Sequence, residues 1–560
     1  MTHGKPNPLV RLLPSLTDVA FLLPVTFLFL YLDGARTMLG DGDTGWHVRT
    51  GEWMLQNGRV PHADMFSYTK PGQPWFAWEW LWELSFGWLH QHWGMAAVVL
   101  ASIVVLCLTF ALLFRVVRRQ CGNSFLAIGV TAIAAAGSSI HFLARPHLFT
   151  LLFTVIFYWI LERANEGKSN TLWLLPGLMV LWTNLHGGFL VGLLLVGAYA
   201  AGEAATWILD SDAERRRTAF AGGKRLALTG GACLLATFVN PYFYHLHVHV
   251  YQYLRDPFLW RSIEEFRPLD FQSAAAVYFE PMFFLGLAAA LWALSRKQFG
   301  RALLLAGLAH MALFAVRNLP IFLLVAAAPV AEMLETALGR LQTAPLAHWV
   351  RRVGARFESV AAEFGAVDRL PRLHACSAVV VVLLATAFYM PAAPYKFRAE
   401  YDPSRYPSKA LSVLRSADSH RIFTHDEWGD YLIYNLYPLK KVFVDGRSDF
   451  YGASFDEKYI DVMNVKYDWE QNLSRFDVDT IVLPVDAALT GALKQSRKWR
   501  VVYDDGIAIV FRFRAPSQMF PSAQVDREAT GLPEAQVQKQ GAISPQLSSP
   551  PNADLPKTRS

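Results

Sequence analysis

Long apolar stretches alternate with short polar segments along most of the chain, as in "AAVVLASIVVLCLTFALLF" (96–114) and "SAVVVVLLATAFYM" (377–390). A helix of about 20 apolar residues is long enough to cross the hydrocarbon core of a bilayer. The pattern therefore predicts a polytopic α-helical membrane protein with about eleven spans. The expected spans are 17–33, 94–114, 125–141, 147–161, 171–185, 188–207, 226–240, 277–295, 302–316, 319–334 and 375–391.

The pattern changes after residue 391. Short β-branched runs, which begin at Arg421, Lys440, Thr480 and Val501, alternate there with stretches that suit helices. This alternation predicts a small α/β domain at 392–514. From about residue 515 the chain is rich in Pro, Ser, Gln and Ala, which predicts a disordered tail at 515–560. We therefore expect a membrane domain at 1–391 that carries a long outer loop at 34–93.

The basic residues predict which side of the membrane each segment occupies. "RVVRR" (115–119), "ERRR" (214–217) and "HWVRRVGAR" (348–356) all lie inside if the N-terminus is cytoplasmic. The outer loop and the C-terminal domain are then extracytoplasmic, and the protein belongs in the cell (inner) membrane. The net charge of +6 follows from this topology and calls for no nucleic acid. No cleavage pattern follows the first apolar segment, so we expect an uncleaved first helix.

Composition agrees with a membrane protein. Hydrophobic residues make up 53% of the chain and charged residues 18%, whereas soluble proteins carry roughly a quarter charged residues. The four cysteines are scattered and have no metal-binding spacing. They indicate neither a disulfide framework nor a zinc site.

Candidate chemistry begins with "GDGDTGWHVRTGEWMLQNGRVPHADMFSYT" (40–69), directly after the first apolar segment. A helix that starts near Asp43 places Asp43, Trp46, His47 and Thr50 on one face. Asp43 would be an N-cap alone in the simplest interpretation. However, it lies close to a membrane span, and the aromatic segment 73–93 that follows is typical of an interfacial helix. We therefore predict that Asp43 is a catalytic or substrate-binding residue.

The same stretch partly matches a calcium-binding loop. Asp41, Asp43 and Glu52 fall at positions 1, 3 and 12 of the template. Position 5 is Gly45, which has no side-chain ligand, and position 6 is Trp46, where the sharp turn needs glycine. These two mismatches argue against calcium binding.

"DTGWHVRTGEWMLQNG" (43–58) resembles the first outer-loop motif of the GT-C superfamily of membrane glycosyltransferases. The layout of the whole chain is similar to the oligosaccharyltransferase catalytic subunit and to lipid-linked-sugar transferases, although the motif itself covers only some tens of residues. The resemblance implies a GT-C-like fold, a polyprenyl-phosphate-linked sugar as donor, and a protein, lipid or glycan as acceptor. It also implies that Asp43 acts as general base.

A second segment, "EWGDYLIYNLYPLKKVFVDGRSDFYG" (427–452), resembles the "WWDYG"-type segment that helps hold the acceptor in oligosaccharyltransferases. The resemblance makes Trp428, Asp430 and Tyr431 candidate acceptor contacts, although one Trp of the family pattern is missing. A strand-to-helix turn at Asp430 and Tyr431, followed by a tight turn at 444–447, explains the same residues without a site.

The resemblance also implies a divalent cation, held by the first-loop Asp and by acids of the second outer loop. Here the second outer loop is "HFLARPHLF" (141–149), which has Arg145 and His147 but no carboxylate. A hard cation needs several oxygen ligands, and Asp41, Asp43, Glu79 and Glu83 would supply them only with help from the fold. We predict no metal cofactor.

Basic and polar side chains gather at the outer ends of predicted spans. Arginine binds phosphate through two parallel hydrogen bonds, which suits a lipid-phosphate leaving group. Snorkelling of Arg317 and burial of His186 remain open alternatives, and "HLHVH" (245–249) suits a strand or loop with weak metal spacing. Membrane-embedded charges are often functional. The predicted substrate-binding residues at this face are Asp41, His47, Arg145, His147, His186 and Arg317.

These features predict a membrane glycosyltransferase that works at the outer face and contacts membrane lipid. A multi-pass transporter or lipid flippase would share the spans and the charged groups. Transporters tend to carry internal repeats and broken central helices, and neither is clear in this sequence. A structural scaffold is a third possibility, but it leaves the acidic first loop without a purpose.

Overall fold

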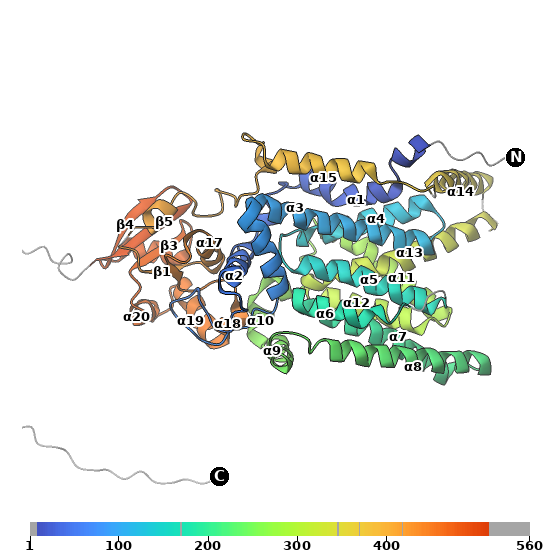
Figure 1. Ribbon diagram of the computed structural model, residues 1–560, viewed down its shortest axis with the longest axis horizontal. Coiled ribbons are helices and arrows are strands. Elements are labelled where there is room, and N and C mark those ends of the chain that lie inside the picture. Colours follow the sequence, from blue (N-terminus) through green and yellow to red (C-terminus); the bar gives the residue numbers. More distant parts are fainter. Residues whose placement is uncertain (1–7, 168–170, 344–346, 369, 417, 515–560) are drawn as a thin grey trace, which may run out of the picture. The chain divides into compact units, whose positions relative to one another are not determined.

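The computed structural model describes residues 8–167, 171–343, 347–368, 370–416 and 418–514. The predicted disordered tail, 515–560, lies outside the described residues. Most of the described chain before residue 391 is helical (Figure 1). These helices are α1 (Leu16–Thr26), α2 (Asp43–Asn57), α3 (Trp80–Gln120), α4 (Ser124–Ser138), α5 (His147–Asn165), α6 (Leu174–Leu185), α7 (Leu190–Leu209), α8 (Ala213–Ala236), α9 (Tyr244–Arg255), α10 (Pro257–Ser262), α11 (Ala276–Ser295), α12 (Phe299–Phe314), α13 (Leu319–Thr343), α14 (His348–Asp368) and α15 (Ala375–Phe388).

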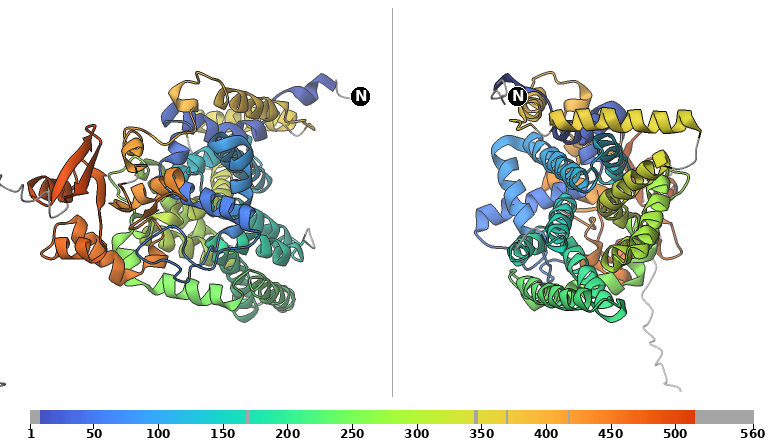
Figure 2. Two further views of the ribbon diagram at one scale, coloured as in Figure 1. Left: turned by 60° about the vertical axis from the view of Figure 1, so that its left-hand side comes forward. Right: turned by 90° about the vertical axis from the view of Figure 1, so that its right-hand side faces the viewer.

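The long helices run side by side as a bundle, seen along its length in Figure 1 and towards its end in Figure 2. Among the described residues, seven helices are long and apolar enough to cross a membrane. Three shorter apolar helices, α6, α12 and α15, lie at further predicted spans. The polytopic helical fold is confirmed. The predicted span 226–240 falls on the end of α8 and the turn after it, and that helix is too polar to count among the apolar ones.

Helix α3 joins the aromatic segment to a membrane-crossing segment. Gly94 interrupts the helix with φ 72° and ψ −172°. This backbone conformation is open to glycine and strained for other residues. The kink separates the aromatic part, Trp80 to Trp93, from the apolar part that begins at Met95. Trp88 and Trp93 are exposed on the aromatic part, as an interfacial helix requires.

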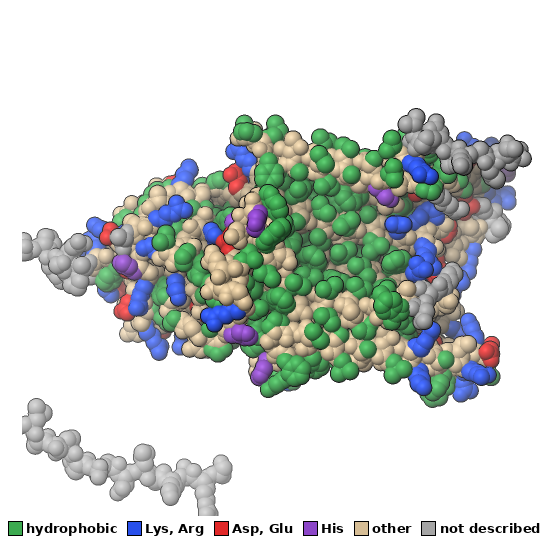
Figure 3. Space-filling view, in the orientation of Figure 1, with side chains coloured by type: hydrophobic (Ala, Val, Ile, Leu, Met, Phe, Trp, Pro, Cys, Tyr) green, Lys and Arg blue, Asp and Glu red, His purple; other side chains and the backbone are tan. Residues whose placement is uncertain are grey.

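The surface of the bundle is divided by residue type. Apolar side chains cover a broad band over the helices, and Lys and Arg gather at the end of the bundle near α14 (Figure 3). The opposite end carries α2, α9 and α10. The stretch 245–249, predicted to be a strand or loop, lies in helix α9, so that prediction was wrong. There Leu246 and Val250 share one buried face at helical spacing, which the alternating histidines obscure.

The C-terminal part is the predicted α/β structure. Its five strands have the order β2-β1-β3-β5-β4, with β1 parallel to β2 and β3, and with β5 antiparallel to β3 and β4. The elements are α16 (Leu411–Leu414), β1 (Arg421–Thr424), α17 (Asp426–Leu436), β2 (Lys441–Val442), α18 (Ser448–Tyr451), α19 (Ala453–Met463), α20 (Trp469–Arg475), β3 (Thr480–Pro484), α21 (Ala488–Gln495), β4 (Trp499–Asp504) and β5 (Ala508–Phe513). The predicted strand runs are confirmed.

The first outer loop is attached to this sheet. Ser67 pairs in parallel with Val442 of β2, the Tyr68 N–H donates to the Val442 carbonyl at 3.1 Å, and the Val442 N–H donates to the Phe66 carbonyl at 3.1 Å. The loop thus extends the sheet at its β2 edge. Helix α2 lies in the same outer loop, before the paired residues, and it packs against α17 of the C-terminal part.

Candidate functional site

Helix α2 carries the predicted catalytic residue at its first position. The helix begins at Asp43, as expected, and ends at Asn57. Trp46, His47, Thr50 and Met54 are buried at helical spacing, so one face of α2 packs inward. The Asp43 N–H donates to Oδ1 of Asp41 at 2.7 Å, which fixes the start of the helix.

Arg145 collects three carboxylates at this point. Its guanidinium lies 2.5 Å from Oδ2 of Asp43, 2.6 Å from Oδ2 of Asp41 and 3.0 Å from Oε1 of Glu265. The side chains of Arg145 and Asp43 are 19% and 15% exposed, so the cluster is buried but reachable. Three acids share one cation, which leaves an excess of negative charge in a poorly solvated place.

Within this cluster, the pKa values of the acids shift by different amounts and in different directions. Burial raises the pKa of Asp43 to about 7, against the opposing effect of Arg145 and with a further rise from Asp41. For Glu265, burial also favours the neutral form, but Arg145 and then Arg317 outweigh it and hold the pKa well below its usual range. Asp43 is therefore the member of the cluster that gains and loses a proton near neutral pH.

The three carboxylates converge as a cation site would require. However, the guanidinium of Arg145 already occupies their shared focus. A divalent cation needs those same oxygens. The residues, as they are arranged, do not fit a divalent cation. The absence of a metal cofactor stays a prediction from the sequence.

Asp43 and Arg145 face one cavity of about 560 Å³. Its lining combines polar side chains, Asp43 among them, with apolar side chains of α9, α12 and α13. Its acidic and basic lining residues are Asp43, His47, Glu79, His141, Arg145, His147, His186, Glu265, His310, Arg317, Arg447 and Asp449. Leu254, Trp260 and Phe314 belong to the apolar lining, and their side chains are also exposed. The cavity is thus open towards the apolar surface.

Arg317 lines the same cavity from the 3₁₀ turn Val316–Asn318. Its guanidinium donates to the Tyr253 hydroxyl at 3.3 Å and lies 4.5 Å from the centroid of the Phe266 ring. Among the described residues, no carboxylate forms an ion pair with it. Arg317 therefore keeps donors free for an anion in the cavity.

A third arginine on the cavity, Arg447, was not predicted. Two of its nitrogens bind Asp445 at 2.7 Å, and Nη2 also lies 2.7 Å from Oδ1 of Asp64. Its side chain is 1% exposed, and Nη1 has no hydrogen-bond partner among the described residues. An unpaired buried donor is costly unless a ligand meets it. Asp64 and Asp445 fix the guanidinium while this one nitrogen stays free.

The three predicted histidines each have a different hydrogen-bond partner. His147 donates from Nε2 to the His141 carbonyl at 2.8 Å, and His47 contacts Glu83 through Nδ1 at 2.9 Å. Burial lowers the pKa of His47 well below its usual range, so its imidazole is neutral. In His186, Nδ1 accepts the Gly188 N–H at 3.0 Å, so the neutral ring carries its hydrogen on Nε2. All three line the cavity.

Comparison with solved structures decides the fold. The oligosaccharyltransferase of Archaeoglobus fulgidus in the apo form aligns with a TM-score of 0.52 and 12% identity, over 84% of this chain and 69% of that one. Its complex with an inhibitory peptide and a dolichol-phosphate aligns with a TM-score of 0.53 and 12% identity, over 89% of this chain and 74% of that one. The protein has the GT-C fold.

A more remote likeness is to ArnT from Cupriavidus metallidurans in the apo state, with a TM-score of 0.47 and 15% identity over 89% of this chain and 96% of that one. No protein-family model matches the sequence, and no curated protein matches it. The resemblance to the GT-C superfamily predicted from residues 43–58 is confirmed at the level of the fold. Identity this low concerns the fold alone.

The second predicted segment, 427–452, lies next to Asp43. Asp430 in α17 is buried and accepts the Gly446 N–H at 2.9 Å. A Cβ at Gly446 would lie 2.5 Å from Oδ1 of Asp43 and 2.7 Å from Oδ2 of Asp430, so glycine is needed there. Burial, and next Asp43, raise the pKa of Asp430 well above its usual value. Asp430 thus supports the position of Asp43 through Gly446.

Trp428 and Tyr431 lie in the same helix but do not line the cavity. Trp428 donates from Nε1 to the Arg405 carbonyl at 2.9 Å, and Tyr431 packs against Tyr401 and Tyr406. Both side chains are buried. Their role as acceptor contacts stays a prediction.

Several residues of the site were missed from the sequence. Glu265 lies in the 3₁₀ turn Glu264–Phe266, which has no motif, and Asp64 lies in the outer loop without a periodic signal. Arg447 was visible as part of "VDGR" (444–447) but was explained as a tight turn. The available signal was an arginine between two acids, Asp445 and Asp449, in a chain where charged residues are few.

Proposed function

We propose that this protein is a membrane glycosyltransferase. It moves a sugar from a polyprenyl-phosphate donor to an acceptor at the outer face of the membrane. The single observation that carries the proposal is the cavity, because it combines a carboxylate, an arginine without an ion-pair partner among the described residues, and an apolar lining. Asp43, Arg317 and the apolar side chains of Leu254, Trp260 and Phe314 all line it.

These groups match the chemical groups of a lipid-phosphate donor. The apolar lining accommodates the first part of the polyprenyl chain, which continues along the exposed apolar surface. Arg317 and the free Nη1 of Arg447 bind the phosphate, and Nε2–H of His186 donates to it. The sugar then lies between the phosphate and Asp43.

The reaction is a displacement at the anomeric carbon. An acceptor hydroxyl attacks that carbon, a new C–O bond forms, and the bond from the carbon to the phosphate oxygen breaks. Asp43 takes the hydroxyl proton, and the lipid phosphate leaves with the bonding electron pair. Arg317 and Arg447 stabilise the charge that develops on the phosphate, which is a preorganised electrostatic contribution. No co-reactant beyond donor and acceptor is required.

Arg145 has a different role in this proposal from the one expected from the sequence. Its guanidinium is already bound by three carboxylates, so it orients Asp43 and limits the rise in its pKa. A pKa near the working pH suits a general base, because a useful share is ionised and it still accepts a proton readily. Arg145 is therefore proposed as a positioning residue.

The proposed orientation follows the basic residues. Lys and Arg gather at the end of the bundle near α14 (Figure 3). The cavity is lined by residues of α2 and α9, which lie at the opposite end (Figure 1). By the positive-inside rule, the basic end is cytoplasmic. We therefore propose that the cavity lies at the outer face, the side predicted from the sequence.

The test measures donor binding and transfer separately. The full chain is purified in detergent and mixed with undecaprenyl phosphate, and thermal unfolding is followed by intrinsic fluorescence. We expect the lipid to raise the melting temperature of the wild type, because it binds the folded state. The Arg317→Gln variant should lose this shift, whereas Arg255→Gln, which removes an exposed arginine of α9 outside the cavity, should keep it.

Transfer is then measured in proteoliposomes. They contain a mixture of radiolabelled undecaprenyl-phosphate sugars and a cell-envelope fraction as acceptor, and the release of undecaprenyl phosphate is counted. Release above a protein-free control supports the proposal. A lipid that moves between leaflets without release of sugar would instead indicate a flippase, and absence of both binding and release would refute the proposed donor.

A further inference from the structure

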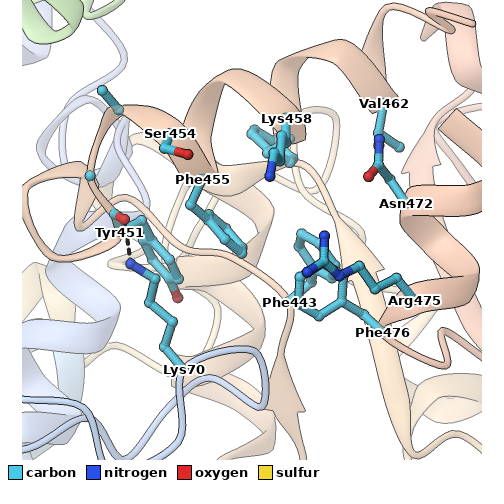
Figure 4. A pocket seen from close by; sticks show the side chains of 13 residues that line it. Lys70, Phe443, Tyr451, Ser454, Phe455, Lys458, Val462, Asn472, Arg475 and Phe476 are labelled. Carbon is cyan, nitrogen blue, oxygen red and sulfur yellow. Dashed lines mark hydrogen bonds between the residues drawn. The ribbon is translucent and has the colours of Figure 1, made fainter. Parts of the chain in front are cut away.

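A second pocket, of about 580 Å³, lies in the C-terminal part, on the other side of α18 from the catalytic cavity. Gly446, Arg447 and Asp449 line the cavity, whereas Tyr451 and residues of α19 and α20 line the second pocket. Lys70 of the outer loop completes it (Figure 4). The helix between the two spaces has only four residues, so they are close neighbours.

Aromatic rings line one wall of the second pocket. The rings of Tyr451 and Phe455 stack with centroids 5.1 Å apart, and Phe443 lies 5.5 Å from Phe455 and 5.1 Å from Phe476. Lys70 lies 5.5 Å from the centroid of the Phe455 ring, and its ammonium also donates to the Tyr451 carbonyl. These contacts hold the wall in place without a ligand.

The pocket is also lined by two exposed cationic side chains. Lys458 from α19 and Arg475 from α20 are directed into the same space (Figure 4). Neither has an ion-pair partner among the described residues, and no acid lines the pocket. Lys70 differs from them because its ammonium is occupied by backbone carbonyls. The two free cations therefore define an anion-binding position beside an aromatic wall.

A buried acid of α19, Asp456, does not neutralise this charge. Asp456 precedes Lys458 by two residues, so it lies on another side of α19. It is buried, and burial raises its pKa to about 8, with a further rise from Asp426. It is therefore mostly protonated at neutral pH.

We propose that this pocket binds an acidic saccharide. Its carboxylate or phosphate lies between Lys458 and Arg475, and the apolar face of its ring packs on Phe455 and Phe476. The amide of Asn472 and the hydroxyl of Ser454, which also line the pocket, bind ring hydroxyls. Sugars suit such a site because each ring has an apolar face as well as polar groups.

The pocket suits an acidic saccharide better than an acidic peptide. Extended peptides are commonly bound along a free strand edge, through backbone hydrogen bonds. The pocket lies instead between α19 and α20, whose backbone groups are used within the helices. Resting on the proposed function, this pocket holds part of a glycan acceptor while its neighbouring sugar reaches Asp43. Binding itself needs no catalysis, so it is tested separately.

The experiment uses the purified full chain in detergent, with binding measured by titration calorimetry. The probes are trigalacturonate, glucose 6-phosphate, neutral maltotriose and a triglutamate peptide. We expect trigalacturonate or glucose 6-phosphate to bind, with maltotriose at least tenfold weaker. Lys458→Gln and Arg475→Gln should each weaken the acidic probe roughly tenfold to a hundredfold, as expected for loss of a charged hydrogen bond.

Arg497→Gln is the matched control, because Arg497 is an exposed arginine of the same C-terminal part that does not line the pocket. It should bind the acidic probe like the wild type. Equal binding of triglutamate, equal weakening by Arg497→Gln, or no binding of either acidic sugar would each overturn the proposal. Repeating the titration with Asp43→Asn separates the two proposals, because that variant should bind the probe normally whether or not the chain transfers sugar.

Discussion

Two arginine clusters at opposite ends of the helical bundle use the same residue types in different ways. Arg145 holds Asp41, Asp43 and Glu265 beside the cavity. Arg301 of α12 holds Glu162 of α5, with Nε to Oε1 at 3.0 Å, and Glu332 of α13, with Nη1 to Oε2 at 2.9 Å. The Arg301 side chain is 7% exposed, against 19% for Arg145.

The clusters differ in how fully the acids are satisfied. Glu162 accepts hydrogen bonds from Arg301, from the Tyr199 hydroxyl and from the Gln120 amide. Asp43 has Arg145 and a longer bond from Trp46 Nε1 at 3.2 Å, and it faces a cavity. A fully satisfied ion pair ties helices together, whereas an under-satisfied one leaves a proton acceptor available. The two clusters contain the same residue types. They differ in where they lie and in how much hydrogen-bonding capacity their acids have left.

The strongest way to test this contrast is Asp43→Asn. Asparagine starts helices about as well as aspartate but cannot take the acceptor proton. We expect transfer to fall by roughly 10² to 10⁴, with an unchanged melting temperature. Undecaprenyl phosphate release in proteoliposomes measures it. Asp33→Asn, at an exposed acid before the cluster, is the control. Normal turnover by Asp43→Asn would remove this carboxylate from the chemistry.

Arg301→Gln tests the other cluster. It leaves Glu162 buried without its cation, and loss of one partner of a buried pair costs about 3–5 kcal/mol in the free energy of unfolding. Transfer per folded molecule should stay normal at low temperature. Denaturation in SDS, followed by circular dichroism, gives the stability. Arg296→Gln, at an exposed arginine nearby, should change it by less than about 1 kcal/mol. A stable but inactive Arg301→Gln protein would contradict the contrast.

A pH profile sharpens the role of Arg145. Asp43 must be ionised to accept a proton, and its pKa is about 7. Transfer should therefore rise with pH and fall roughly tenfold for each unit well below that pKa. The charges that face Asp43 are Arg145, Asp41 and Glu265, with Asp430 behind it. Arg145→Gln removes the opposing cation, so the profile should shift to higher pH. A shift to lower pH, or none, would show that Arg145 does not act through Asp43.

The smallest expected effect is at Glu79, another acid of the cavity. Burial, and next Asp449, raise the pKa of Glu79 to about 8. At pH 7 it is therefore about nine-tenths protonated and resembles glutamine in charge. Glu79→Gln should change transfer at pH 7 by less than roughly threefold. A large loss at pH 7 in the same release assay would mean that the ionised form of Glu79 takes part in the reaction.

Much of the fold could be predicted from the sequence, because apolar runs and β-branched runs are local signals. The start of α2 at Asp43 was predicted, and Asp43, Arg145 and Arg317 were each predicted as site residues from their places near span ends. That the three line one cavity comes from the structure. Glu265 and Arg447 could not be found in that way. Glu265 meets Arg145 across 120 positions and Arg447 meets Asp64 across 383, and no local pattern records such pairs.

Attachment of the outer loop to the sheet has a consequence for biosynthesis. Thr69 bonds to the Phe443 carbonyl across 374 positions, and Arg447 joins the same assembly. Chains emerge from the ribosome N-terminus first, so Asp43 is made long before Gly446 and Arg447, which line the same cavity. A nascent or stalled chain therefore contains Asp43 without the groups that complete the cavity. The cavity can be completed only once the last fifth of the chain is being translated.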